Sequence, residues 1–203
     1  MEPRIAKVIS YIFHPLFIPS YAILILLNTN NHLSFMIPFK GKLMLVGVVM
    51  LTTVILPILT SFMLKRMKII HSLLPQTKEE RIYLLLNTAI FYYLTYYLVK
   101  GTQVSVVFNY FMMGSTFLVI CSIMITFFHR ISLHMIATGG MLGGLLGLTF
   151  GHAVDATGFI IVVILLAGLI GTARMTMDSQ KPAEVYSGFL VGMTVMFLLF
   201  VLI

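Results

Sequence analysis

Residues Gly139–Gly151 read GGMLGGLLGLTFG, and glycines recur there at four-residue spacing, at Gly139, Gly143, Gly147 and Gly151. Positions four residues apart lie on one face of an α-helix, so the pattern predicts a helix with one face of bare backbone. In lipid, small residues at this spacing let two helices approach each other closely. We therefore expect this helix to pack tightly against a neighbouring membrane helix.

A glycine-rich phosphate-binding loop is the competing interpretation of this stretch. Such loops follow a strand of a soluble domain and end in Lys followed by Ser or Thr. The stretch lacks the Lys-Ser/Thr ending, and an apolar run rather than a soluble strand precedes it. The helix-packing interpretation is therefore favoured.

The composition is that of an integral membrane protein. Of 203 residues, 60% are hydrophobic and 9% are charged, and the mean hydropathy is +1.05, more apolar surface than a soluble globule can hide. Apolar runs near the ~20 residues that cross a bilayer lie at about Ile5–Leu27, Leu43–Leu64, Ile82–Val99, Ser105–Phe128, Leu133–Phe150, Thr157–Thr172 and Val185–Ile203. We expect an all-α polytopic bundle of six to seven transmembrane helices. The polar loop Lys65–Arg81 is too short to fold alone, so residues 1–203 form a single membrane domain.

The first apolar run is interrupted. His14, Pro15 and Pro19 occur within the sequence FHPLFIPSY, and proline breaks the hydrogen-bond ladder of a helix. We therefore expect a bent or re-entrant segment here. No small-residue cleavage site follows the run, so it does not resemble a signal peptide.

The ionisable residues exclude several classes of function. The single cysteine, Cys121, lies in an apolar run, so neither a disulfide framework nor a thiolate metal site is expected. A metal site formed by His129, His134, His152 and Asp155 fails because the first two would lie at the opposite end of one span from the last two. The net charge of +7 resides at the ends of spans, which favours anionic lipid head groups over nucleic acid as partners. No cofactor is expected.

With seven spans, alternate loops fall on opposite faces of the membrane. The face that carries the N-terminus and the loops near residues 65–81, 129–132 and 173–184 holds ten Lys and Arg, whereas the other face holds three. By the positive-inside rule the first face is cytoplasmic.

Three polar clusters lie on that first face. They are TKEERIY (Thr77–Tyr83), HRISLH (His129–His134) and ARMTMDSQKPAEVYSG (Ala173–Gly188), and each immediately precedes an apolar run. Each therefore lies near the N-terminal end of a span, where free N–H groups and the helix dipole favour an anion. Four cations accompany the clusters, and together they indicate a phosphate site: Lys78, Arg81, Arg130 and Arg174.

Simpler interpretations compete for some of these residues. The cations Lys65, Arg66 and Lys68 suit snorkelling to lipid head groups. Glu79 and Glu80 are adjacent to Lys78 and Arg81, so KEER can form a surface run of ion pairs. The remaining histidines have no companion pattern: His14, His32, His71 and His152. Arg174 differs because it lies in a short polar break between two spans, where an unpaired charge is costly.

The third cluster resembles a motif of the membrane branch of the type 2 phosphatidic acid phosphatase and haloperoxidase superfamily. That motif reads Ser-Arg-x5-His-x3-Asp and leads into the last helix. Arg174 matches its arginine, Gln180 stands at the position of its histidine, and Glu184 at that of its aspartate. Pro182 and the helix start VYSGFLVG complete the likeness.

The resemblance extends over about Lys78–Ile203. The sequence ISLH is similar to the second motif, Pro-Ser-Gly-His, through Ser132 and His134, with leucine where glycine is expected. TKEERIYLL is similar to the first motif, Lys…Arg-Pro, through Lys78 and Arg81, without its proline. Two apolar runs separate these segments, whereas a loop usually joins the first two motifs in the family.

The resemblance implies a metal-free phosphomonoesterase that acts on lipid phosphates in the bacterial inner membrane, usually from the outer side. It assigns phosphate binding to Arg174, Lys78, Arg81 and Ser132. It makes His134 the acid that protonates the leaving alcohol, position 180 the nucleophile and Glu184 its orienting partner. A glutamine amide has no basic lone pair, so Gln180 cannot form a phosphohistidine-like intermediate.

Three hypotheses follow. The first is a phosphatase-like protein that recognises a lipid or isoprenyl phosphate and is impaired in classical hydrolysis. The second is an active lipid phosphatase that uses His134 as nucleophile, or a water activated by Glu184. The third is a transport or scaffold protein, supported by the apolar composition alone.

Overall fold

In a computed structural model of the chain, the residues described are 1–29, 37–73, 75, 77–100, 106–152, 154–177 and 180–202, without the side chain of His152. His32 and the His152 side chain therefore lie outside the described part. The regular elements there are all helical: α1 (Pro3–Ile12), the 3₁₀-helix η1 (Pro15–Phe17), α2 (Ile18–Asn28), α4 (Phe39–Met50), the π-helix η2 (Leu51–Ile55), α5 (Leu56–Arg66), α6 (Lys78–Lys100), α7 (Val106–Phe128), α8 (Leu133–His152), α9 (Thr157–Thr176) and α10 (Pro182–Leu202).

Seven helical segments of the described chain are long and apolar enough to cross a membrane. They are Pro3–Asn28, Phe39–Arg66, Lys78–Lys100, Val106–Phe128, Leu133–Gly151, Thr157–Thr176 and Pro182–Leu202. The expectation of an all-α polytopic membrane bundle is thereby confirmed, at the upper end of the predicted six to seven spans. Each segment coincides with one predicted apolar run.

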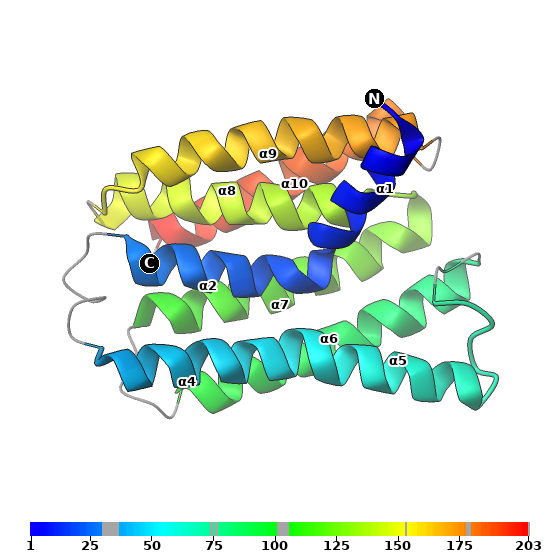
Figure 1. Ribbon diagram of the computed structural model, residues 1–203, viewed down its shortest axis with the longest axis horizontal. Helices are drawn as coiled ribbons and strands as arrows, with labels where there is room; N and C mark the ends of the chain where they lie inside the picture. Colours follow the sequence, from blue (N-terminus) through cyan, green and yellow to red (C-terminus); the bar gives the residue numbers. More distant parts are fainter. Residues whose placement is uncertain are drawn as a thin grey trace.

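The long helices run side by side along a common direction (Figure 1). At one end of the bundle α5, α7 and α9 end and α6, α8 and α10 begin, and we call this the site end. The three polar clusters of the sequence therefore gather at one end, as the alternation of loops predicts.

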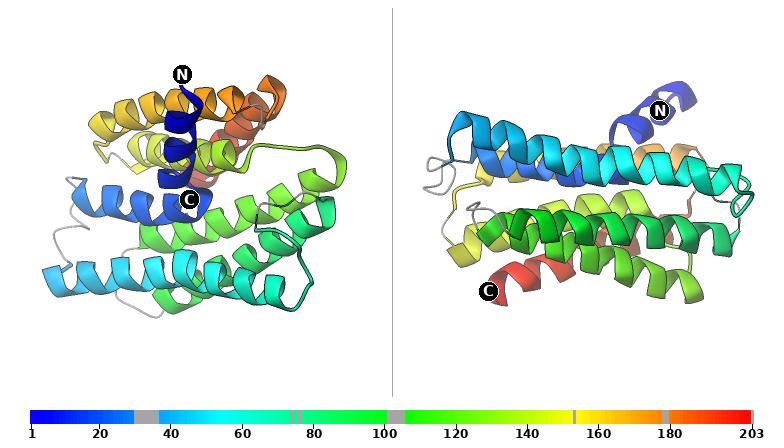
Figure 2. Two further views of the ribbon diagram at one scale, coloured as in Figure 1. Left: turned by 45° about the vertical axis from the view of Figure 1, so that its right-hand side comes forward. Right: turned by 90° about the horizontal axis from the view of Figure 1, so that it is seen from below.

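The first candidate span is bent, as its prolines predict. The α-helix α1 ends at Ile12, and Pro15 opens η1 before the chain resumes as α2. Because Pro15 and Pro19 have no N–H to donate, a continuous ladder cannot pass this point. The axis of α1 is turned across the bundle, whereas α2 runs along it (Figures 1 and 2).

The helix α8 forms the centre of the bundle. In its apolar stretch 67% of the residues are buried, against at most 44% in any other candidate span. The predicted glycine face packs against α10 at backbone distance. A Cβ atom at Gly139 would collide with the carbonyl oxygen of Phe189, and one at Gly143 with that of Met193. The predicted close approach of a neighbouring helix is therefore present.

The helix α10 contributes glycines of its own to this contact. A Cβ atom at Gly192 would collide with the carbonyl oxygen of Ile136, and one at Gly188 would lie 2.8 Å from that of Ser132. These glycines are also four residues apart, in the stretch VYSGFLVG. The two helices thus present reciprocal small-residue faces, which membrane helices use to bring their backbones together.

A different contact joins α6 to the α4–η2–α5 segment. Thr95 donates to Thr52 through a 2.7 Å hydroxyl–hydroxyl hydrogen bond, and Thr60 donates to Asn87 Oδ1 at 2.8 Å. The amide of Asn87 also donates to the carbonyl of Pro57 at 3.0 Å. Side-chain hydrogen bonds of this kind hold helices together in lipid, where apolar burial contributes little.

The glycine contact predicts opposite effects for two substitutions to alanine. Gly143→Ala places a Cβ against the backbone of Met193 and should lower the free energy of unfolding by about 1–3 kcal/mol, the usual cost of overpacking. In Gly168→Ala the new Cβ meets no atom within 4 Å, and helix propensity should leave stability unchanged or raise it by up to ~1 kcal/mol. Thermal melting in detergent by circular dichroism checks both. Equal melting temperatures for the two variants would contradict the glycine contact.

Candidate functional site

The site end contains three helix N-termini, two of which are capped by a hydroxyl. The Thr77 hydroxyl accepts from Glu80 N at the start of α6, and the Ser132 hydroxyl accepts from Met135 N at the start of α8. At the start of α10 the Lys181 carbonyl accepts from Glu184 N at 3.0 Å. The expectation that each polar cluster lies at the N-terminal end of a span is therefore confirmed. The free N–H groups and dipoles at helix N-termini favour an anion at this end of the bundle.

Ser132 ties the second cluster to the third. Its backbone N–H donates to the carbonyl of Glu184 at 3.0 Å, and the residue is fully buried. The hydroxyl caps α8, so in this arrangement Ser132 aligns the starts of α8 and α10. The two segments that resemble the second and third motifs therefore lie in direct contact.

Arg174 lies in the last turn of α9 and is half-buried. Its Nε donates to Gln180 Oε1 at 3.3 Å, and its Nη1 donates to the Ser10 hydroxyl at 3.4 Å. Gln180 thus holds the arginine with its amide oxygen. The guanidinium is oriented from two sides, by the loop before α10 and by α1.

His134 is buried beneath α1 with 9% exposure. Its Nε2 lies 3.1 Å from the carbonyl oxygen of Ser10. Because a carbonyl oxygen only accepts, Nε2 carries the proton and donates it there. The Nε2 of His134, the predicted acid, is therefore engaged in a hydrogen bond with the backbone of α1.

The ring of His14 lies edge-on to that of His134, with 5.6 Å between centroids. The charge of Arg174 acts on both rings. The sequence gives His14 no companion, and the structure corrects this, because His14 belongs to the same cluster as His134 and Arg174. The available signal was the presence of a histidine within an apolar membrane run, which is itself unusual.

Arg81 lies beside this cluster at the start of α6. It donates from Nη2 to the carbonyl of Ile131, while its Nε is buried without a hydrogen-bond partner among the described residues. Arg130 and Arg174 repel its charge, and Glu184 attracts it. Two further guanidinium groups and one carboxylate therefore lie within electrostatic range of Arg81.

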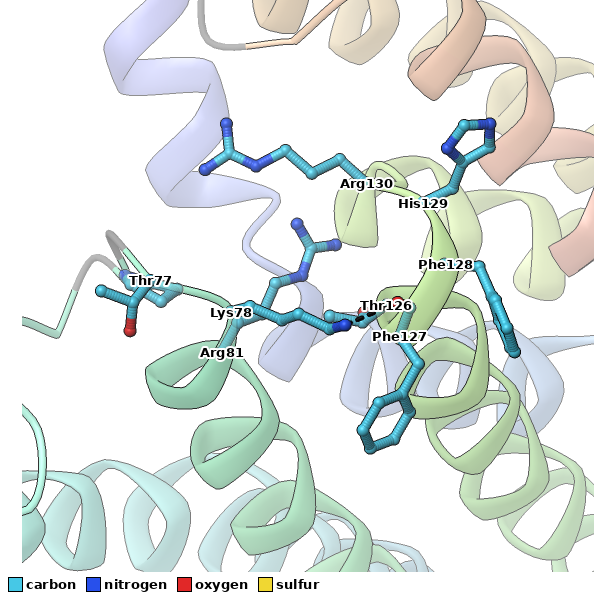
Figure 3. Close-up of a pocket in the computed structure, with 9 residues that line it drawn as sticks. Thr77, Lys78, Arg81, Thr126, Phe127, Phe128, His129 and Arg130 are labelled. Carbon is cyan, nitrogen blue, oxygen red and sulfur yellow. Dashed lines mark hydrogen bonds between the residues drawn. The ribbon is translucent and has the colours of Figure 1, made fainter.

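A pocket of about 270 Å³ opens between the start of α6 and the end of α7 (Figure 3). Lys78 extends across it and donates to the carbonyl of Phe127. The Nζ of Lys78 lies 5.1 Å from the centre of the Phe127 ring. Arg81 and Arg130 direct their guanidinium groups away from Phe127 and Phe128. The pocket therefore has a cationic side toward the arginines and an aromatic side.

The possible run of surface ion pairs in KEER does not hold for Glu80. This residue is 5% exposed, and its Oε1 accepts from His71 N at 2.7 Å and lies 3.1 Å from His71 Nδ1. Glu80 therefore fastens the loop before α6, and His71, which had no companion pattern, is its partner.

The groups considered for a metal lie apart. His129 and His134 are at the site end, whereas Asp155 precedes α9 at the opposite end (Figure 1). Asp155 accepts from Thr157 N at 3.1 Å, and this hydrogen bond lowers the pKa of its carboxyl. Within the described ranges, three His, Cys, Asp or Glu side chains are nowhere grouped to hold a metal ion.

Comparisons of the chain with protein-family models, with curated proteins and with solved structures found no match. The chemistry of the site therefore rests on the geometry of the chain itself.

The role of Glu80 can be tested against its neighbour. Glu80→Ala removes the buried carboxylate that accepts from the partly buried His71 N–H and should lower the free energy of unfolding by about 1–3 kcal/mol. Glu79→Ala changes an exposed side chain and should stay within about 0.5 kcal/mol of the parent. Both are read from thermal melting in detergent, and limited proteolysis of the loop near His71 should accelerate for Glu80→Ala alone. Equal effects of the two variants would refute the fastening role.

Proposed function

We propose that this chain is a multi-pass membrane protein with a fold like that of the type 2 phosphatidic acid phosphatases. It binds the phosphate group of a lipid or isoprenyl phosphate at the site end and lacks classical phosphohistidine hydrolysis. The observation that carries the proposal is the convergence of Arg81, Arg130 and Arg174 beside the N-termini of α8 and α10.

The charges of Arg130 and Arg174 repel that of Arg81. Like charges that are partly removed from water destabilise one another more than charges in bulk solvent, because screening is weaker. An anion with several oxygens offsets this repulsion and can accept from more than one guanidinium. Phosphate suits this role because each planar arginine can donate two parallel hydrogen bonds to it. Arg81 Nε, buried with no acceptor among the described residues, is a donor for such an oxygen.

The chemistry of Gln180 argues against classical hydrolysis. Its Oε1 accepts from Arg174, and an amide has no basic nitrogen for attack on phosphorus. His134 donates from Nε2 to the Ser10 carbonyl, so this nitrogen carries a proton and is not free to attack phosphorus. The geometry therefore favours binding over the alternative in which His134 serves as nucleophile.

The site end also favours a lipid as the source of the phosphate. It coincides with the ends of membrane helices, and the pocket beside Lys78 has Phe127 and Phe128 as an apolar side. From the resemblance we place the protein in a bacterial inner membrane. Ten of the thirteen Lys and Arg of the chain lie at this face. By the positive-inside rule, this distribution supports a cytoplasmic site end.

Binding is tested with three variants of arginine to glutamine. Short-chain phosphatidic acid is titrated into the purified protein in detergent, and heat is measured by calorimetry. Arg81→Gln and Arg174→Gln should each weaken binding by on the order of 10- to 100-fold, the value of a charge-assisted hydrogen bond of ~1.5–3 kcal/mol. Arg66→Gln is the control, because it is an exposed arginine at the end of α5 and should change little. An equal loss in all three variants would reduce the site to general surface charge.

Restoring the nucleophile tests the second part of the proposal. Gln180→His should introduce measurable phosphate release, because imidazole supplies the attacking nitrogen and Glu184 can accept its other N–H. Adding Glu184→Ala should remove most of that gain. If the unmodified protein already releases phosphate at ~1 per second or faster, hydrolysis is intact and this part of the proposal is wrong. A folded Gln180→His variant that binds lipid phosphate but stays inert would show that more than the nucleophile is missing.

A further inference from the structure

The helix α1 contacts the bundle through a narrow face. Its buried residues are Ala6, Ile9 and Ser10. Ala6 and Ile9 belong to a small apolar cluster with residues of α8, α9 and α10. The remainder of α1 is exposed, although the helix belongs to a strongly apolar chain.

The exposed face of α1 is graded from basic to apolar. At the angular spacing of an α-helix, its residues follow one another around the helix in the order Lys7, Tyr11, Arg4, Val8, Ile12 and Ile5. Val8, Ile12 and Ile5 are 56%, 50% and 51% exposed. A helix with cations on one edge and aliphatic residues on the other suits the boundary between head groups and acyl chains.

The direction of α1 agrees with that location. In Figure 1 and in both views of Figure 2, α1 is turned away from the common direction of the long helices. Because those helices are the ones that cross the membrane, a helix turned across them runs closer to the membrane plane. It also lies at the site end, where the head groups of one leaflet are expected.

We propose that α1 binds the interface of an anionic lipid bilayer and does not cross it. Arg4 and Lys7 lie among the head groups, and Ile5, Val8 and Ile12 enter the boundary with the acyl chains. Within the first candidate span, the part that runs along the bundle is then α2. Lipid is the occupant because the face combines cations with aliphatic side chains, which complements an anionic surface above acyl chains.

Ser10 connects this interfacial helix to the candidate site. Its carbonyl accepts from His134 Nε2, and its hydroxyl accepts from Arg174 Nη1 at 3.4 Å and donates to Met177 Sδ at 3.8 Å. The cluster therefore lies directly beneath the head-group level. If the anion-binding proposal holds, the phosphate of a lipid in that leaflet is at the depth of Arg174.

The position of α1 is tested by spin labels in the full-length protein. Cys121 is the single cysteine, so Cys121→Ser provides a background for Lys7→Cys, Val8→Cys and Ile12→Cys. Leu165→Cys, at an exposed position in the middle of α9, serves as the mid-membrane reference. Lys181→Cys, at an exposed position just before α10, serves as the aqueous reference. The depth of each nitroxide is measured from its collisions with oxygen and with a water-soluble nickel complex, in vesicles of zwitterionic lipid with and without phosphatidylglycerol.

An interfacial helix gives shallow and similar depths at Val8 and Ile12, with Lys7 nearer to water. A crossing helix would place Ile12 deeper than Val8 by the rise of four residues, about 6 Å, and that result would overturn the proposal. Labels at Val8 and Ile12 as accessible to nickel as the one at Lys181 would also overturn it. Labels shielded from both reagents would show a protein contact instead of lipid.

Charge is tested with a matched pair of double variants. Arg4→Gln with Lys7→Gln should move the Val8 label toward water in vesicles that contain phosphatidylglycerol and leave it unchanged in zwitterionic ones. Lys65→Gln with Arg66→Gln removes two exposed cations from the end of α5 and should have no effect on that label. An equal shift in both lipids, or none in either, would refute binding to anionic lipid. None of these measurements depends on phosphate binding at the candidate site.

Discussion

The backbone contact between α8 and α10 is the constraint on which the site depends. Glycines on both helices let the carbonyl oxygens of one lie where the other has no side chain. At its site end this contact continues into the hydrogen bond from Ser132 N to the Glu184 carbonyl. The polar segments at the starts of α8 and α10 are consequently adjacent. Arg174, in the last turn of α9, lies beside them. A wider separation of the two helices would separate these segments as well.

Charge is the second constraint. Lipid tails offer no solvation to a guanidinium, so arginines near the membrane need hydrogen-bond acceptors. Among the described residues, neutral groups accept from both arginines: the Ile131 carbonyl from Arg81, and the Gln180 amide and Ser10 hydroxyl from Arg174. These acceptors orient the two guanidinium groups. The contacts thus hold two of the cations of the site end, where the proposed anion would bind.

Much of the fold follows from local patterns. The apolar runs predict the seven candidate spans, Pro15 and Pro19 predict the bend, and the spacing of Gly139 and Gly143 predicts the close helix contact. These features depend on composition and period over a few turns, which one sequence contains. The partner of the glycine face was not identified, although Gly188 and Gly192 carry the complementary spacing, because a pattern on one helix does not specify which helix it meets.

Only the local contacts of the candidate site could be predicted, because a single sequence contains patterns over short stretches. The contact between Arg174 and Gln180 spans a short loop, but the contact between His134 and Ser10 joins residues 124 positions apart. Such pairs depend on the three-dimensional path of α1, so Ser10 and His14 were missed. Glu80 was misjudged because its helical neighbours suggested ion pairs, whereas a loop donor, the His71 N–H, lies within 2.7 Å.

The link between His134 and Ser10 has an asymmetric consequence for the evolution of this chain. The donor is a side chain that histidine provides, whereas the acceptor is a main-chain carbonyl that any residue provides. Position 10 can therefore change its residue type and keep this hydrogen bond, while position 134 cannot. Selection on this hydrogen bond would constrain the side chain at position 134, whereas the side chain at position 10 is constrained only through its own hydroxyl contacts. Methods that infer contacts from covariation between positions would miss this hydrogen bond, although it attaches α1 to α8 at the centre of the bundle.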